Sequence, residues 1–461
     1  MGNIGNMGNM NRPGKTGATD ATGQTEMRRK SDETRETRLS RLRHPFHVQA
    51  PLFALPLLAL VVVAGTVLAG AGAASAELEA DPHGIVASLP DTTGDHWVWV
   101  ADRIFQHSLL FDGDDGNVLG AIDTNFNIAG RAPLGSRVRG EFYMVESVYA
   151  RGHYGERSDF VTIYDSRSLG VVGEIKLPIH TAEAGHGVGL VDVLDEGRFL
   201  VVFSQNPTAA VGVVDLIARR FVATIDTAGC AGVYPTGPAS FIMLCGNGTA
   251  MAVQLDETGE SAALVSSEPF FDVVEDPITE KGVRDGSKWL FASFDGWLHE
   301  VETSGDVPSL SKRWSLFSDS ERADGWRIGG VQHLSLHRDS GRLYSLVHQG
   351  GPGSHKDPGF EIRVYDSHAR TSVATYEAPG LVAPFLRPYL DLESDSFAYR
   401  AISWLLPSLG AHSVVVTQDA QPLLFVRHSE LGAIGVLDAL TGEHVRNLEE
   451  SGISGGIMAL P

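Results

Sequence analysis

The stretch IGVLDALTGEHVRNL, residues 434–448, contains the pattern that decides the fold. A short apolar run of β-forming residues ends in Asp438, turn-forming residues follow, and a second strand-like run begins. Side chains alternate between the two faces of a strand, so one face of each run can be buried. The pattern therefore predicts a β-hairpin whose turn is opened by an acidic residue.

The same pattern occurs seven times along the chain. Its instances are SLLFD ending at Asp112, VTIYD at Asp165, VGVVD at Asp215, MAVQLD at Asp256, LHEVE at Glu302, IRVYD at Asp366 and IGVLD at Asp438. Successive acidic residues lie 41 to 72 residues apart, and a four-stranded propeller blade requires a repeat of roughly 40 to 50 residues. After residue 80 no apolar pattern keeps a helical period. The sequence predicts an all-β, seven-bladed β-propeller; unrelated hairpins in β-sandwich domains are the alternative.

The N-terminal region has the features of a targeting segment and is not part of the predicted propeller. Residues 1–47 are polar and basic, and we expect them to be disordered. Residues 48–76 contain no Asp, Glu, Lys or Arg. They have an apolar centre and end in the small residues Ala74-Ser75-Ala76, as at a signal-peptidase cleavage site, which predicts an export signal cleaved after Ala76. The apolar run is long enough that an uncleaved membrane anchor is the alternative, and Met27 is an alternative start. The propeller domain is then 77–461.

The charge of the chain argues against a nucleic-acid partner. Lys and Arg total 36 and Asp and Glu total 57, a formal net charge of −21. Removing residues 1–76 takes away nine basic and five acidic residues, which leaves the mature chain near −25. Nucleic-acid phosphates require a basic surface, whereas an acidic surface suits an exported protein that meets a basic or neutral partner.

Both cysteines, Cys230 and Cys245, lie in the part of the chain that is predicted to be exported. In an oxidising compartment an even pair predicts a disulfide. The alternatives are a metal pair, for which no ligand-spaced histidine or second cysteine pair lies nearby, and a redox dithiol, for which no Cys-x-x-Cys exists.

Searching the sequence for catalytic and metal motifs returns no match. It contains no nucleophile elbow, phosphate loop or His-Glu-x-x-His helix. DGDDGN at 112–117 is acidic like a calcium loop but lacks the closing glutamate, so we interpret it as a solvated turn. His333 and His337 would share a strand face about 13 Å apart, too far for one ion. We expect the histidines to be structural, and no catalytic or metal-binding residue is assigned.

Several long segments resemble the heavy subunit of the quinoprotein amine dehydrogenases, the methylamine and aralkylamine dehydrogenases. The segments are RSDFVTIYD (157–165), PTAAVGVVDL (207–216), GCAGVYPTGPASFIMLCGNGTAMAVQLD (229–256), SERADGWRIGGVQHLSLHRDSGRLYSLVHQ (320–349), and VTQDAQPLLFVRH with IGVLDALTGEHVR (416–446). The resemblance covers roughly residues 85–461 in the same order. Family heavy subunits are seven-bladed propellers, in agreement with the repeat count.

The resemblance implies a function that the residues alone do not show. In that family two heavy and two light subunits form a periplasmic heterotetramer. The tryptophan tryptophylquinone cofactor is built in the light subunit, and electrons pass to a blue copper protein of the amicyanin or azurin type. Primary amines are oxidised to aldehydes and ammonia. The heavy chain would then supply a docking platform and part of the substrate channel while binding no cofactor itself.

One site residue follows from the resemblance. Phe126, in GNVLGAIDTNFNIAG (116–130), matches the position where family heavy chains place a phenylalanine at the mouth of the substrate channel. An aromatic ring there would sort amines by size; an ordinary buried phenylalanine is the alternative. Residues 381–412 contain more chain than a blade connection requires. The resemblance does not decide the substrate. The ERADGW segment is more similar to the methylamine dehydrogenases, and HKDPGFEIRVYD is more similar to the aralkylamine dehydrogenases, which oxidise aromatic amines. A non-catalytic exported propeller that binds a ligand or a protein is the alternative function.

Overall fold

The fold was analysed in a computed structural model, which describes residues 88–102, 104–123, 132–136, 139–152, 154–182, 188–379, 402, 410–428, 433–449, 452 and 456–461. The predicted N-terminal extension and export signal, Phe126 and most of the 381–412 segment lie outside the described residues. Among the described residues, no helix combines the length and the apolar character that a membrane crossing requires.

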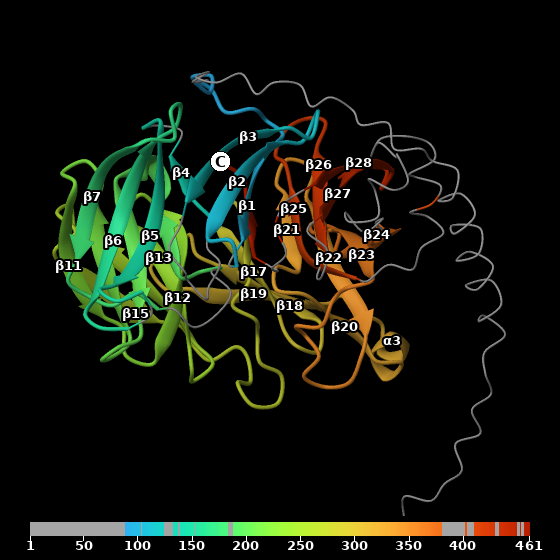
Figure 1. The fold of residues 1–461 in the computed structure, drawn as a ribbon. Helices are drawn as coiled ribbons and strands as arrows, with labels where there is room; N and C mark the ends of the chain where they lie inside the picture. The colour runs from blue at the N-terminus through green and yellow to red at the C-terminus, as the bar shows by residue number, and fades with distance from the viewer. Residues whose placement is uncertain are drawn as a thin grey trace, which may run out of the picture. The chain divides into compact units, whose positions relative to one another are not determined.

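The described residues form seven antiparallel sheets, which Figure 1 shows in the radial arrangement of a β-propeller. Six of the seven sheets have four strands, and the sheet that is sixth in chain order has five. The strands of the first three sheets are β1 (Trp97–Asp102), β2 (His107–Asp112), β3 (Val118–Asp123) and β29 (Met458–Ala459); β4 (Leu134–Ser136), β5 (Glu141–Tyr149), β6 (Arg157–Asp165) and β7 (Val171–Leu177); β8 (Val191–Val193), β9 (Phe199–Ser204), β10 (Ala210–Asp215) and β11 (Arg220–Asp226).

The remaining four sheets follow in chain order around the ring. Their strands are β12 (Cys230–Gly237), β13 (Ser240–Cys245), β14 (Ala250–Leu255) and β15 (Ala262–Ser266); β16 (Val283–Asp285), β17 (Lys288–Ala292), β18 (Trp297–Glu302) and β19 (Ser309–Ser315); β20 (Trp326–Ile328), β21 (Leu334–His337), β22 (Arg342–Gln349), β23 (Glu361–Asp366) and β24 (Thr371–Glu377); β25 (Ala411–Val416), β26 (Leu423–His428), β27 (Ala433–Asp438) and β28 (His444–Glu449). Helical structure is sparse among the described residues, with α3 (Asp319–Ala323) and the short 3-10 turn η2 (Asp195–Gly197). The predicted all-β, seven-bladed propeller is confirmed.

The C-terminal strand closes the ring. β29 pairs with β1, with Trp99 opposite Ala459 and Val100 opposite Met458, so the last residues complete the first sheet. The blue and red strands consequently lie side by side in Figure 1. The side chain of Gln332 strengthens this closure, because its amide donates to the Met458 carbonyl and accepts from the Met458 amide, both at 3.0 Å.

Apolar side chains fill the interfaces between neighbouring sheets all the way round. At the closing interface, Val98 and Phe111 of the first sheet pack with Phe425 and Val436 of the seventh, and all four are fully buried. Complete burial of one such side chain stabilises the fold by about 1.5–3 kcal/mol. The alternation noticed in the sequence therefore serves sheet-on-sheet packing.

The seven acidic residues occupy equivalent positions, at the turn between the third strand of each sheet and its outermost strand. In five of the seven turns the acidic side chain accepts hydrogen bonds from backbone N–H groups two or three residues later in the chain. In a sixth turn, Glu302 accepts them from the residues one and two positions later. The bonds reach Asp112 from Asp114, Asp165 from Arg167 and Ser168, Asp215 from Ile217 and Ala218, Glu302 from Thr303 and Ser304, Asp366 from His368 and Ala369, and Asp438 from Leu440 and Thr441. In the seventh, Asp256 accepts from the amides of Thr258 and Glu260. The predicted role of the acidic residue is thus confirmed.

These turns define the two ends of the propeller. We call the end that carries the seven turns the acidic-turn face. The opposite end, where segments such as 267–282 lead from the outermost strand of one sheet into the next sheet, we call the connector face. Asp115, in the acidic stretch 112–117, accepts the amide of Asn117 at 2.8 Å, as expected for a turn.

The sixth sheet departs from the simple repeat because its innermost position is divided. Both β20 and β21 pair with β22, on successive parts of it. Between them Gly330 has a φ of +91°, and a Cβ at this position would lie 2.5 Å from the carbonyl oxygen of His412. Glycine is therefore required where the chain bends between the two strands.

Replacing Asp215 with alanine removes the two hydrogen bonds that hold its turn and the ion pair of its carboxylate with Arg198. Asp215 is 5% exposed, and its carboxylate accepts both turn amides at 2.9 Å. We expect the free energy of unfolding to fall by about 1–3 kcal/mol, measured by chemical denaturation. Asp226→Ala, an exposed aspartate at the end of β11 in the same sheet, is the control and should have little effect. Equal stability of the two variants would contradict the role of the turn.

A histidine connects the first and seventh sheets at the acidic-turn face. His96 Nδ1 lies 2.6 Å from Asp114 Oδ1, and Nε2 lies 3.2 Å from Asp419 Oδ2. Burial alone would lower the pKa of His96, but hydrogen bonds and charge from the two aspartates outweigh it, so that the pKa is raised above 6.5.

The raised pKa of His96 predicts a pH-dependent contribution to stability. Protonation is favoured in the folded chain, so the contribution is complete below pH 6.5 and is lost as the pH rises through the higher folded pKa. We expect His96→Gln to reduce the free energy of unfolding by up to about 1 kcal/mol at pH 5.5 and by much less at pH 9. Urea denaturation of both proteins across this range measures the difference, and a pH-independent difference would refute the contribution.

Candidate functional site

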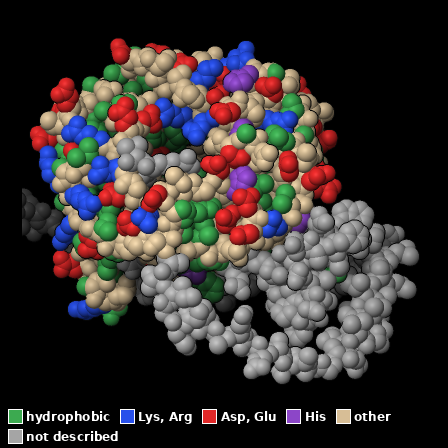
Figure 2. Space-filling view, turned by 90° about the horizontal axis from the view of Figure 1, so that it is seen from above, with side chains coloured by type: hydrophobic (Ala, Val, Ile, Leu, Met, Phe, Trp, Pro, Cys, Tyr) green, Lys and Arg blue, Asp and Glu red, His purple; other side chains and the backbone are tan. Residues whose placement is uncertain are grey.

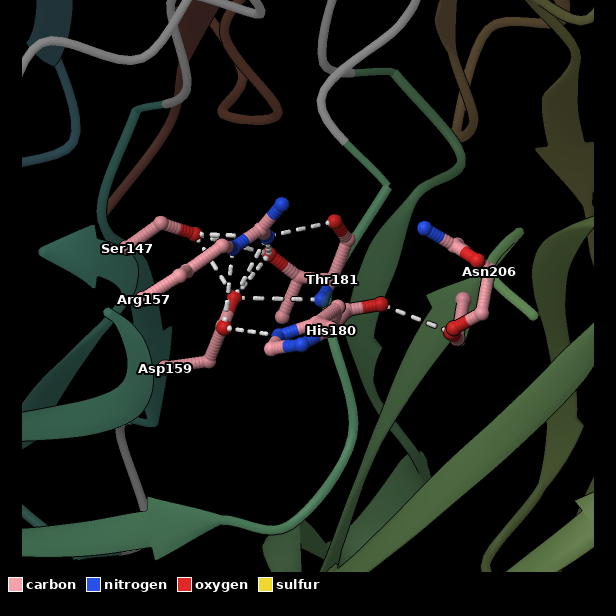
Figure 3. A network of polar contacts seen from close by, with 7 residues as sticks. Ser147, Arg157, Asp159, His180, Thr181 and Asn206 are labelled. Atoms are coloured by element: carbon pink, nitrogen blue, oxygen red, sulfur yellow. Dashed lines mark hydrogen bonds and ion pairs between the residues drawn. The ribbon is translucent and has the colours of Figure 1, made fainter. Parts of the chain in front are cut away.

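A buried carboxylate on the connector face holds the second and third sheets together. Asp159, on β6, is 1% exposed. It accepts hydrogen bonds from Arg157 Nη2 at 2.6 Å, Ser147 Oγ at 2.7 Å and the amide of Thr181 at 3.1 Å. Figure 3 shows these side chains converging on the carboxylate. Burial alone would raise the pKa of Asp159, but the hydrogen bonds outweigh it and lower the pKa below its usual value.

The same carboxylate orients a histidine that reaches the surface. His180 Nδ1 lies 2.9 Å from Asp159 Oδ2, and the His180 side chain is 49% exposed. Ser204 at the end of β9 donates to the His180 carbonyl at 2.6 Å, which ties this connector to the third sheet. Figure 3 shows His180 between Asp159 and Asn206. Nε2 has no hydrogen-bond partner among the described residues and is therefore available to solvent or to another molecule.

The connector face also exposes large apolar and aromatic side chains. Tyr154, at the tip of the β5–β6 hairpin, is 64% exposed, and the Arg151 guanidinium lies 5.8 Å from the centre of its ring. Phe105, between β1 and β2, is 57% exposed, and Val274, between β15 and β16, is 79% exposed. Tyrosine, other aromatic residues and arginine are enriched at protein–protein interfaces. The composition of this face favours binding of a protein partner.

An apolar cavity of about 340 Å³ lies at this face between the third and fourth sheets. Phe203, Tyr234, Leu244, Phe271 and Val273 contribute to its walls. A cavity of this size and composition accommodates an apolar side chain or a small ligand.

The cysteines form the predicted disulfide. Cys230 and Cys245 are direct partners in the β12–β13 pairing, with Cα atoms 3.9 Å apart. Both are 6% exposed, and Cys245 lines the apolar cavity. The disulfide therefore fixes one wall of that cavity.

The histidines considered in the sequence are held separately. His333 Nε2 lies 3.1 Å from Thr279 Oγ1, whereas His337 Nε2 lies 2.9 Å from the Asp419 carbonyl. Burial lowers the pKa of His333 to about 3 and that of His299 to about 4. In the described part of the chain, no group of three or more His, Cys, Asp or Glu side chains is arranged to hold a metal ion.

Phe126, the one residue to which a substrate-channel role was assigned, lies outside the described residues. In the chain it falls between β3 and β4, and the described end of β3 leads to the connector face. Sequence analysis assigned no functional role to Asp159, His180 or Tyr154. The available signal was Arg157 and Asp159, two residues apart in RSDF and therefore on one face of a strand.

Comparison with known proteins assigns the family. A family model described as "Methylamine dehydrogenase heavy chain (MADH)" matches residues 97–378, more than half of the chain. The chain belongs to the methylamine dehydrogenase heavy-chain family.

Individual relatives are distant in sequence, but their alignments cover most of this chain. The methylamine dehydrogenase heavy chain of Paracoccus versutus is 25% identical over 346 residues, which span 74% of this chain and 73% of that protein. The heavy chain of Methylorubrum extorquens is 24% identical over 389 residues, 83% of this chain and 87% of that one.

Among solved structures, a putative 6-phosphogluconolactonase from Bacteroides fragilis superimposes with a TM-score of 0.51 at 9% identity. The match covers 80% of this heavy-chain family member and 99% of the other chain. At this identity the likeness shows the propeller fold and nothing further.

We expect the Asp159 network to be important for stability. Asp159→Asn removes the charge from a carboxylate that accepts from Arg157, Ser147 and Thr181, and should lower the free energy of unfolding at pH 7 by about 3–5 kcal/mol. Because its folded pKa is lowered, the contribution is present above the unfolded pKa of 3.8 and is lost as the pH falls through the folded pKa. Glu174→Gln, an exposed charge-to-amide change in the same sheet, is the control for chemical denaturation at pH 7; equal effects of the two changes would refute the expectation.

Proposed function

We propose that this protein is the heavy subunit of a periplasmic amine dehydrogenase that oxidises a primary amine to an aldehyde and ammonia. The observation that carries the proposal is the family match over residues 97–378. The two relatives compared above are heavy chains of methylamine dehydrogenases. In the proposed enzyme the tryptophan tryptophylquinone of the light subunit supplies the oxidising group, and a blue copper protein of the amicyanin or azurin type accepts the electrons.

The part of this chain in the reaction would be to bind the light subunit and to restrict access to the substrate channel. The connector face suits the first role, because Tyr154, Phe105 and Val274 expose apolar surface there. Ring closure and the Asp159 contacts hold these elements in fixed relative positions. A rigid surface loses less conformational entropy on binding, which favours affinity.

The proposed location is the periplasm, reached after cleavage of the export signal near Ala76. The disulfide between Cys230 and Cys245 supports it, because such bonds persist in oxidising compartments. Two heavy and two light subunits would form the heterotetramer.

The mature heavy chain alone should be folded but inactive towards amines. Co-production with the light subunit and its maturation factors should restore amine-dependent dye reduction, tested with methylamine and phenylethylamine, which also decides between the two substrate classes. Circular dichroism of the isolated chain confirms that it is folded. Amine-dependent dye reduction by the isolated folded chain would overturn the subunit proposal, and the absence of any binding to the light subunit would favour a non-catalytic propeller.

Phe126→Ala tests the proposed position of Phe126 at the mouth of the substrate channel. We expect assembly and the quinone spectrum to be retained, while the ratio of kcat/KM between methylamine and phenylethylamine changes by about 10- to 200-fold, because removing a ring from a pocket wall alters discrimination by about 1–3 kcal/mol.

Phe111→Ala is the matched control, because Phe111 is fully buried between the first and seventh sheets. This change should cost about 3–5 kcal/mol of stability and leave the substrate ratio unchanged. A Phe126 variant that behaves like the Phe111 variant would assign Phe126 to the blade core instead.

A further inference from the structure

The outermost strand of the fourth sheet is β15 (Ala262–Ser266), and its outer edge is free. Among the described strands it pairs with β14 and with no other. The free edge of an outermost strand presents a row of backbone N–H and C=O groups, which another chain can use to pair. Natural sheets protect such edges with charged side chains or with β-bulges, which twist the edge away.

The outermost strands of the other six sheets carry both kinds of protection. Each of them contains at least one Asp, Glu, Lys or Arg residue. Each also pairs with its neighbour through a shift in register, of the kind that a bulge or irregularity produces. These strands are β3, β7, β11, β19, β24 and β28.

Strand β15 has neither protection. Its sequence, AALVS, contains no charged residue, and its pairing with β14 runs over the whole strand without a shift in register. It exposes apolar side chains as well, because Leu264 is 43% and Val265 is 38% exposed. A regular, uncharged edge with exposed apolar side chains is suited to accept an added strand.

A groove of about 730 Å³ lies beside the segment that follows β15. Residues 268–272 form one side of it, and residues 307–310 with Arg313, from the fifth sheet, form the other. Its apolar wall includes Val307 and Leu310, which are 48% and 37% exposed. The groove can therefore accommodate apolar side chains of a bound segment.

Exposed acidic residues lie on both sides of β15. Glu257 and Glu260 precede the strand, and Glu268 and Asp272 follow it. Figure 2 shows further Asp and Glu side chains around the acidic-turn face, the end at which β15 begins. Arg220 lies 3.9 Å from Glu260, but both side chains are more than half exposed, so solvent weakens this pair. The charges favour a bound segment with basic residues on either side of an uncharged centre.

The same charges disfavour a second copy of this chain as the occupant. Antiparallel pairing of two β15 strands about Leu264, their middle residue, would place Glu260 of each copy opposite Glu268 of the other. Like charges directly opposite each other destabilise a pair of strands. The formal net charge of −21 adds repulsion between two copies.

We propose that β15 is the docking edge for an extended segment of a partner protein, which adds a strand to the fourth sheet. The segment carries uncharged β-forming residues opposite β15 and Lys or Arg on both sides. Main-chain hydrogen bonds supply the affinity, while the flanking charges and the groove supply the selectivity. This docking edge does not depend on the proposed enzyme activity.

The probe is the end-capped peptide Lys-Thr-Val-Thr-Val-Thr-Lys, titrated calorimetrically into the full mature chain without partner subunits. We expect it to bind once per chain with a Kd below about 1 mM, and hydrogen exchange to slow at the amides of β15 but not at those of β24. An analogue N-methylated at its central amides keeps the charge and loses the ladder hydrogen bonds, so it should bind at least about tenfold more weakly.

Val265→Lys gives β15 a charge of the kind that the other edges carry, and it should weaken binding of the probe at least about tenfold. The matched control is Val373→Lys, because Val373 is 52% exposed on β24, an outermost strand that already has a shift in register. The control variant should bind the probe as the unchanged protein does. Melting curves establish that both variants are folded.

Several results would overturn the proposal. They are the absence of probe binding below about 1 mM, equal binding of the N-methylated analogue, and equal binding by the Val265→Lys variant. A peptide with Glu in place of both Lys residues that binds as tightly as the probe would refute a basic partner. A mature chain that sediments as a dimer, and as a monomer after Val265→Lys, would assign the edge to a second copy instead.

Discussion

The structure depends on closing a ring of seven sheets with a C-terminal strand of two residues. Until β29 pairs with β1, the first sheet has an open edge and the apolar interface between the first and seventh sheets is incomplete. Several side chains from distant parts of the chain reinforce the closure. Gln332 binds the backbone of Met458, His96 reaches Asp419, and Arg427 donates to the Ala101 carbonyl at 2.7 Å. The two chain ends of the propeller therefore stabilise each other.

The two faces of the closed ring differ in the side chains that they carry. The acidic-turn face holds its hairpins by carboxylates such as Asp215 and Asp438, which accept backbone amides of their turns. The connector face carries the segments that link one sheet to the next together with hairpin turns, and it presents Val274 from a linking segment and Tyr154 and Phe105 from hairpin turns to solvent. Because the sheets beneath are fixed, such residues keep a defined arrangement, as a partner-binding surface requires.

The sequence predicted those parts of the fold that repeat locally. The hairpins could be recognised because an alternating run, an acidic residue and a turn recur within one short segment, as in VGVVD before Asp215. Several innermost strands carried no comparable signal, since β8 and β4 are three residues long and β29 is two. The divided edge of the sixth sheet was equally hidden, because it depends on the contact between Gly330 and His412.

The candidate site was less predictable, for a physical reason. Asp159 meets Ser147, Thr181 and His180 only after three strands and a connector are assembled, and their spacing in the sequence has no period. The disulfide could be foreseen from an even pair of cysteines in the part of the chain predicted to be exported, and the structure adds that adjacent antiparallel strands bring Cys230 opposite Cys245. The function came from resemblance rather than from chemistry, since the described residues of this chain contain no metal-binding cluster.

The central claim is that this propeller is one subunit of an amine dehydrogenase. Its most direct test is purification of the protein from its native host under conditions that preserve complexes, followed by mass spectrometry and absorbance spectroscopy of the co-purifying chains. The account predicts a small second subunit, in equal number, with a quinone absorbance that is bleached when a primary amine is added. Recovery of the propeller without such a subunit, from cells that oxidise amines, would contradict it.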